Sequence, residues 1–146
     1  MLLEHTIEIQ KSPEDVFAFL SHQPNHVQFV KENVASEQVS PGPMGVGTHL
    51  QNTARVFGRT MVEKFEVVAF EPPRVLAKSS REGSSLETTD RFELTATPGG
   101  THLRFVVTGT PRNLGERLLI ALMGPVVRRS MRRSLATLKA ILERPS

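Results

Sequence analysis

Asp90 is the residue whose type and position best suit acid–base chemistry in this sequence. It stands in an alternating segment with Thr88 and Phe92 at the same parity, so a strand there would turn all three side chains toward one face. A carboxyl group on the apolar face of a sheet loses water, which raises its pKa and suits a general acid or base. The same group could instead reach solvent at the strand end or pair with an arginine.

Asn52 is the second polar side chain that shares the parity of apolar neighbours, here Leu50 and Ala54. An amide in an otherwise apolar pocket can orient a carbonyl or hydroxyl group of a ligand. It can equally be satisfied by neighbouring backbone at a bulge or strand end, because buried polar groups must be paired. The sequence pattern leaves both interpretations open.

Several kinds of catalytic and metal site are absent from the sequence. There is no cysteine, and no serine stands in a Gly-x-Ser-x-Gly elbow. The five histidines lack metal-ligand spacing: His22 and His26 are four apart, but Pro24 between them prevents a shared helical face. The glycines from 42 to 47 are interrupted by Pro43 and precede no helix, unlike a phosphate loop. We therefore predict no metal site and no cofactor.

The length of 146 residues suits one domain with a substantial core, which we predict over residues 1–146. The net charge of +3 is uneven: after residue 111, eight Arg or Lys stand against two Glu. Without Trp or Tyr for base stacking, this distribution argues against nucleic acid as a partner. No signal segment or apolar run of membrane-spanning length stands out, so we expect a cytoplasmic protein.

A long amphipathic helix is predicted from Asn113 to about Glu143. Asn113 and, three residues later, Glu116 form the pattern of a capping box. Pro125 lacks the amide proton and crowds the preceding turn, so we expect a kink there, or a short helix followed by a long one. One apolar stripe contains Val127, Met131, Leu135, Leu138 and Leu142, and the opposite arc carries Arg128, Arg129, Arg132, Arg133 and Lys139.

The rest of the chain is predicted to form strands and two short helices. Residues 2–10 alternate as a half-buried strand, Ser12 and Pro13 begin one short helix, and a second follows near His26. In the strand near residues 60–70, Phe65 and Val67 favour one parity as inward and Val62 and Val68 favour the other, so the pattern leaves the inward face open, and a bulge would explain the conflict. Further strands are predicted near residues 33–39, 48–56, 60–70, 75–80, 85–97 and 101–108.

The connections between these strands are short, which makes neighbouring strands antiparallel. A sheet with one apolar face needs an apolar cover, and the amphipathic helix provides one. We therefore expect an α+β fold: a curved antiparallel sheet of about seven strands, two short helices, and the long C-terminal helix across the concave face.

Four segments resemble the START-related, birch-pollen-allergen-like (SRPBCC) helix-grip superfamily, and within it the small bacterial polyketide cyclase/dehydrase and lipid transport group. They are residues 9–20 with Ser12-Pro13-Glu14-Asp15, residues 42–48, residues 65–76 with Glu71-Pro72-Pro73-Arg74, and the hairpin at 97–101. The closing helix follows in the right order. The resemblance implies a cavity between sheet and helix that holds an apolar or aromatic small molecule.

From this resemblance we expect a carrier or sensor of a small hydrophobic ligand, lipid-like or polyketide-like. The alternative is a cyclase/dehydratase-type enzyme in which Asp90, with Asn52, moves protons. A second alternative is weak docking of the basic helix on an anionic membrane surface. The residues indicate no particular oligomeric state. The side chains expected to line the cavity are Leu50, Asn52, Phe65, Phe92, Phe105, Met123, Val127 and Met131.

Overall fold

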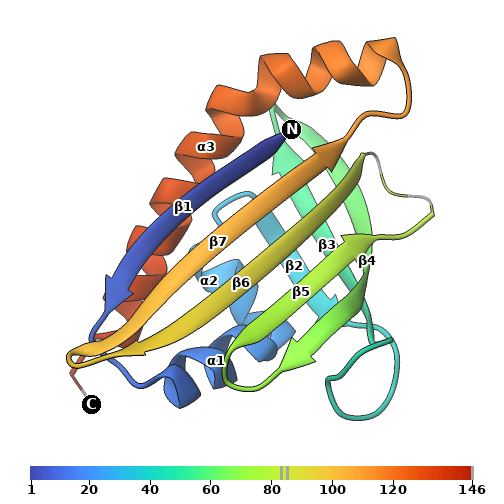
Figure 1. Ribbon diagram of the computed structural model, residues 1–146. Helices are drawn as coiled ribbons and strands as arrows, with labels where there is room; N and C mark the ends of the chain where they lie inside the picture. The colour runs from blue at the N-terminus through green and yellow to red at the C-terminus, as the bar shows by residue number, and fades with distance from the viewer. Residues whose placement is uncertain (83, 85, 146) are drawn as a thin grey trace.

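The computed structural model describes residues 1–82, 84 and 86–145. Within them the strands are β1 (Leu2–Ile9), β2 (Asn33–Gln38), β3 (His49–Val56), β4 (Arg59–Glu71), β5 (Val75–Ser80), β6 (Glu87–Thr97) and β7 (Gly100–Thr110). The helices are α1 (Pro13–Ser21), the short 3-10 helix η1 (Gln23–Asn25), α2 (His26–Phe29) and α3 (Leu114–Leu142). The strands form one antiparallel sheet in the order β1-β7-β6-β5-β4-β3-β2 (Figure 1). The predicted start of the sixth strand at residue 85 lies outside the described residues.

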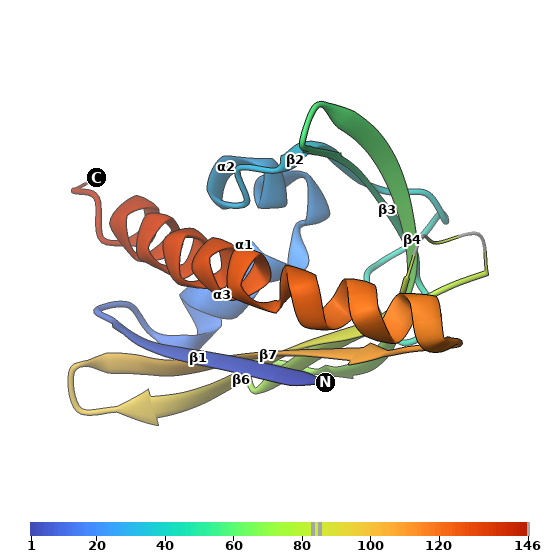
Figure 2. The same cartoon turned by 90° about the horizontal axis from the view of Figure 1, so that it is seen from above.

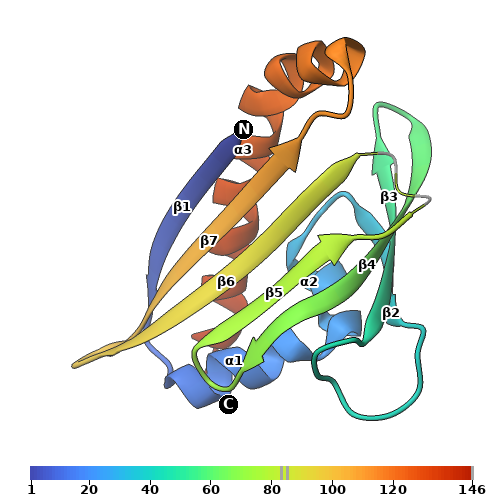
Figure 3. The same cartoon turned by 45° about the vertical axis from the view of Figure 1, so that its right-hand side comes forward.

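All the helices lie on one side of this sheet. Figure 2 shows α3 running along β1 and β7, while β2, β3 and β4 curl up beside it. Figure 3 shows α1 and α2 behind the lower end of the sheet, on the same side as α3. The fold prediction is therefore confirmed: a curved seven-stranded antiparallel sheet packs against a long C-terminal helix.

The ends of the helices follow the capping signals. The side chain of Ser12 accepts a hydrogen bond from the amide of Asp15, and Pro13 opens α1. The side chain of Asn113 accepts from the amide of Glu116 at 2.8 Å, whereas the Glu116 carboxylate reaches the amide of Arg112. α3 continues without a break through Pro125, and Figure 1 shows its first turns at an angle to the rest.

β4 contains the irregularity that the sequence suggested. Its pairing with β5 shifts register between Val67 and Ala69. Before the shift, Phe65 and Val67 are buried; after it, Val68 is exposed and Phe70 packs against the core. The bulge thus lets side chains of both parities face inward along one strand.

The core packs α1 and the second half of α3 onto the sheet. Side chains from α1, β1, β3, β4 and β7 meet two leucines of α3 there. Fully buried members include Ile9, Val16, Leu20, Leu50, Val67, Leu103, Leu135 and Leu138. Burial of this apolar surface holds the helix across the sheet at about 25 cal/mol per Å² removed from water.

Candidate functional site

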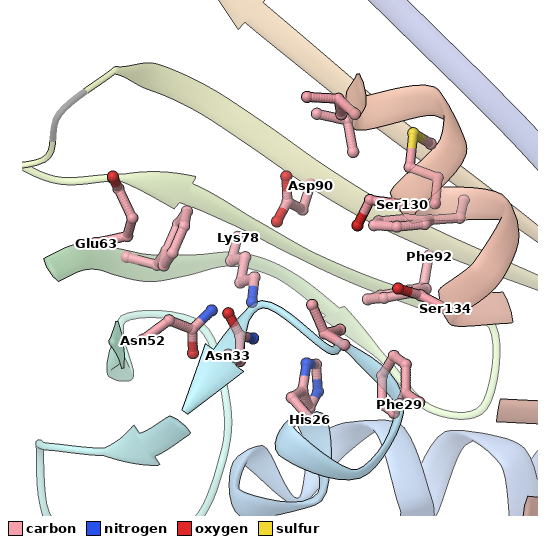
Figure 4. A pocket seen from close by; sticks show the side chains of 16 residues that line it. His26, Phe29, Asn33, Asn52, Glu63, Lys78, Asp90, Phe92, Ser130 and Ser134 are labelled. Carbon is pink, nitrogen blue, oxygen red and sulfur yellow. The ribbon is translucent and has the colours of Figure 1, made fainter. Parts of the chain in front are cut away.

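A cavity of about 290 Å³ lies between the sheet, α2 and the middle of α3. β3, β4, β5, β6 and β7 each contribute side chains to it, and the residues around α2 and α3 close it (Figure 4). Seven of the side chains predicted from the sequence meet here: Asn52, Phe65, Asp90, Phe92, Phe105, Val127 and Met131.

Two predicted lining residues lie outside this cavity wall. Leu50 has the expected inward parity, but it is 2% exposed and belongs to the hydrophobic core. Met123 precedes Pro125 in the first half of α3, where Gly124 packs near the sulfur of Met1. Leu50 pairs with the lining residue Phe65 but packs in the core, and Met123 lies one helical turn before the lining residue Val127.

Aromatic rings form one wall. Phe92 and Phe105 are opposite each other in the register of β6 and β7, and their rings stack with centroids 4.4 Å apart and planes 9° from parallel. Met131 of α3 is buried and also lines the cavity. A flat aromatic wall with an adaptable thioether beside it suits an apolar or aromatic guest.

Lys78 is a buried cation that the sequence analysis did not single out. It shares the parity of Leu76 on β5, is 6% exposed, and lines the cavity. Its Nζ lies 4.7 Å from the centroid of the Phe65 ring. Burial lowers the pKa of Lys78, and the nearby charge of Asp90 opposes that shift.

Asp90 lies directly across from Lys78 in the register of β5 and β6. Burial raises the pKa of the Asp90 carboxyl, and Lys78 opposes the shift. No carboxylate among the described residues approaches Lys78 Nζ within the 4.0 Å of an ion pair. The side chains of Lys78 and Asp90 therefore line the same wall without forming an ion pair, and burial shifts the pKa of each group toward its neutral form.

His26 of α2 is held in its neutral form. Its Nε2–H donates to the carbonyl oxygen of Leu20 at 2.8 Å, and its ring lies against Phe29 and Phe92. Burial, reinforced by the charge of Lys78, lowers the pKa of His26 to about 3. The histidine can therefore shape the cavity and accept a hydrogen bond at Nδ1, since its one N–H is used by Leu20, and it does not carry charge at neutral pH.

The amide of Asn52 is paired by a side chain rather than by backbone. Gln23 Nε2 donates to Asn52 Oδ1 at 2.8 Å, and both residues are buried. This contact ties the 3-10 helix to β3. It fixes the orientation of an amide that borders the cavity, as a specificity group in an apolar pocket requires.

Glu32 fastens α3 over the cavity. Its carboxylate accepts from the hydroxyl of Ser130 and from Nη2 of Arg133, the latter at 2.9 Å. Ser130 lines the cavity, as do Val30 and Asn33 on either side of Glu32 in sequence. The turn before β2 is thereby linked to the middle of α3.

The described residues contain neither a cluster of metal-binding side chains nor a membrane-spanning helix. Among the described residues, no three His, Cys, Asp or Glu side chains gather as a metal site needs. Over those residues, no helix is long and apolar enough to span a membrane.

The sequence matches one protein family along almost its whole length. The family model described as polyketide cyclase / dehydrase and lipid transport matches residues 2–143. No curated protein matches the chain.

Solved structures share the fold at low sequence identity. An aromatase/cyclase, Zhui, from a Streptomyces species superposes with a TM-score of 0.84 at 16% identity, covering 99% of this chain and 94% of that one. A protein of Mesorhizobium loti gives a TM-score of 0.74 at 19% identity, covering 100% and 99%. The protein Ara h 8.0201 gives 0.72 at 15% identity, covering 97% of each chain.

Proposed function

Because this chain belongs to the polyketide cyclase / dehydrase and lipid transport family, we propose that it binds a small apolar or aromatic ligand between the sheet and α3. The ligand is lipid-like or polyketide-like, and the protein acts as its carrier or sensor. The observation that carries the proposal is the cavity of about 290 Å³, with its stacked aromatic wall and its few fixed polar groups.

The side chains that line the cavity can distinguish between ligands as well as bind them. Apolar contact with Phe92, Phe105 and Met131 supplies affinity, at about 25 cal/mol per Å² of buried apolar surface. Lys78 and Asn52 border the same space and can recognise an oxygen on the guest. A guest with an apolar body and one carbonyl or hydroxyl fits both features.

Two measurements test the binding function. Native mass spectrometry of protein purified from cells should show a co-purified small molecule. Titration with phenylnaphthylamine, an apolar dye whose emission rises in apolar surroundings, should saturate at one site on the folded protein. Absence of both signals would contradict the proposal.

Two Phe substitutions, one inside the cavity and one on the exposed face of α3, test where the dye binds. Ser134→Phe places a ring into the space below α3, because Ser134 is 2% exposed and lines the cavity. We expect dye affinity to fall about tenfold or more, since the ring takes the volume that the dye needs. The matched control Ala136→Phe adds the same ring on the exposed face of α3 and should leave affinity unchanged. Equal effects of the two variants would argue against this site.

The second candidate is catalysis of the cyclase/dehydratase type. It is favoured by one observation: the carboxyl of Asp90 borders the cavity and has a raised pKa, as a general acid or base requires. In this case the cavity orients a folded polyketide-like chain, and Asp90 moves the protons.

Asp90→Asn distinguishes the two functions. If Asp90 is the acid–base group, turnover of a poly-β-ketone substrate should fall about 100-fold or more while substrate affinity stays within about twofold. The substitution keeps the shape of the side chain. An unchanged rate would rule out this role for Asp90 and leave the binding function standing.

A further inference from the structure

We propose that Lys78 captures aldehyde or ketone ligands by forming a reversible imine between its Nζ and the carbonyl carbon. This assignment deepens the proposed binding function and rests on it, because it names the chemical class of the guest.

The first argument is the position of the Lys78 amine and its lack of a hydrogen-bond partner. Lys78 is 6% exposed, yet its Nζ accepts and donates no hydrogen bond and joins no ion pair among the described residues. Every fully buried side-chain nitrogen or oxygen in those residues has a hydrogen-bond partner. The amine of Lys78, which has no such partner, is therefore not fully buried, and Figure 4 shows it pointing into the cavity.

The second argument is what surrounds the amine. A lysine kept for structure normally closes an ion pair or reaches solvent with its head group. Here the ring of Phe65 lies 4.7 Å from Nζ and Asp90 stands on the neighbouring strand, outside ion-pair distance. Removal from water without an ion pair favours the neutral, nucleophilic amine, in agreement with the lowered pKa of Lys78, although the carboxyl of Asp90 opposes that shift.

The third argument is the acid beside it. Residues opposite each other on neighbouring strands have Cβ atoms about 5 Å apart, so Lys78 and Asp90 start side by side on one wall and can both contact one carbonyl guest in the cavity. Its raised pKa increases the share of the protonated form, which is the form that can donate a proton.

The chemical steps balance without an oxidant or reductant. The Nζ lone pair attacks the carbonyl carbon, a C–N bond forms, and the carbonyl oxygen takes the proton of Asp90. The nitrogen then returns a proton to the Asp90 carboxylate. Asp90 protonates the resulting hydroxyl group, the C–O bond breaks, water leaves, and the C=N bond forms. Loss of the remaining nitrogen proton to Asp90 restores the acid, so the net change is amine plus carbonyl to imine plus water.

Reductive trapping tests this proposal with 2-naphthaldehyde as the probe and cyanoborohydride as the trap. Cyanoborohydride reduces the imine to a stable secondary amine, which adds mass to the intact protein and can be mapped to one peptide. We expect one adduct per chain, at Lys78, forming about tenfold or more faster than at any other lysine. The reason is that each unit of pKa lowering raises the neutral fraction of an amine about tenfold.

Variants and a hydrocarbon probe separate the outcomes. Lys78→Met should lose the adduct and still bind naphthalene, while Lys64→Met, on the exposed side of β4, should keep full labelling. The wild-type peptide map decides the question even if Lys78→Met does not fold. Naphthalene binding without a Lys78 adduct, or labelling spread evenly over surface lysines, overturns the imine alone. Failure of both naphthalene and the aldehyde to bind overturns it together with the proposed binding function.

Discussion

His26 is a buried, neutral histidine, and its environment makes stability depend on pH. Burial and the charge of Lys78 lower its pKa from the ordinary value of 6.5 to about 3. Between those two values the unfolded chain binds a proton at this position and the folded chain does not. Protonation therefore favours unfolding, so the contribution of His26 is complete above pH 6.5 and is lost as the pH falls toward 3.

The free energy of unfolding should consequently fall by about 2 kcal/mol between about pH 7.5 and about pH 5 through this residue alone. Urea denaturation at the two pH values measures the change. His26→Gln can keep a donor for the Leu20 carbonyl but cannot titrate, so it should lose that part of the slope. The exposed His22→Gln serves as the control and should keep it. Identical slopes for wild type and His26→Gln would contradict the assignment.

At the residue scale, strand parity predicted much of the cavity wall. It placed Asp90, Asn52 and Phe92 on the inward face because alternation is a local property. It did not identify Lys78, since a lysine is expected at the surface and its burial depends on distant parts of the chain closing over β5. The equal parity of Leu76 and Lys78 was the available signal.

α3 has an exposed arc whose chemistry changes at Pro125. Before the proline the exposed side chains are mainly apolar, and Leu114, Leu118 and Leu122 are 70%, 65% and 76% exposed. After it the exposed residues are mainly basic, with Val126 exposed next to the proline. They include Arg128, Arg129 and Arg132, whereas Arg133 pairs with Glu32. Apolar side chains next to arginines are what an anionic lipid surface attracts, by insertion and by charge.

We propose from this arc that α3 docks weakly on anionic vesicles. Replacing Arg128, Arg129 and Arg132 by Gln should lower the affinity for phosphatidylserine vesicles about 100-fold, because each basic residue near the surface is worth about 1 kcal/mol. Vesicle sedimentation measures it, and binding of the wild type should collapse as salt is added. Lys64→Gln, on the exposed side of β4 and away from α3, is the control. Salt-independent binding would contradict electrostatic docking.

At the element scale, the boundaries of α1 and α3 were predictable because Ser12, Pro13 and Asn113 act within one turn. The bulge in β4 was indicated only as a conflict of parities, since its position depends on how β5 pairs with it. The reach of α3 beyond the cavity was not predictable from its stripe. Met123 has the right helical phase, but the neighbouring Gly124 lies near Met1, and Met123 is not part of the cavity wall.

Across the whole molecule, Glu32 joins parts of the chain that are distant in sequence. It links the turn before β2 to Ser130 and Arg133 of α3, beside the cavity. We expect a guest to enter or leave by opening of this contact, because the side-chain contact can break without breaking strand pairing.

Glu32→Ala should therefore raise the dissociation rate of phenylnaphthylamine about fivefold, which corresponds to roughly 1 kcal/mol for a partly exposed charged contact. Stopped-flow fluorescence measures the rate, and the association rate should rise with it. Glu37→Ala on the exposed side of β2 is the matched control. A changed equilibrium affinity with an unchanged dissociation rate would contradict a gating role.

The overall architecture followed from the order of patterns, because short connections restrict strands to antiparallel neighbours and the single amphipathic helix has one apolar surface to cover. The pairing of β1 with β7 was harder to predict from the sequence, since it joins Leu3 to Val107 across most of the chain. Only the tertiary fold shows which residues lie beneath α3.

That pairing has a consequence during synthesis on the ribosome. β1 is made first, but its partner β7 and the covering α3 are made last. A nascent chain can form the local hairpins β3–β4, β4–β5 and β6–β7 early, because their partners are close in sequence. β1 can join the sheet only after β7 has been made, and the cavity is covered only after α3 has followed it. The protein is therefore expected to acquire its guest only once α3 has packed against the sheet.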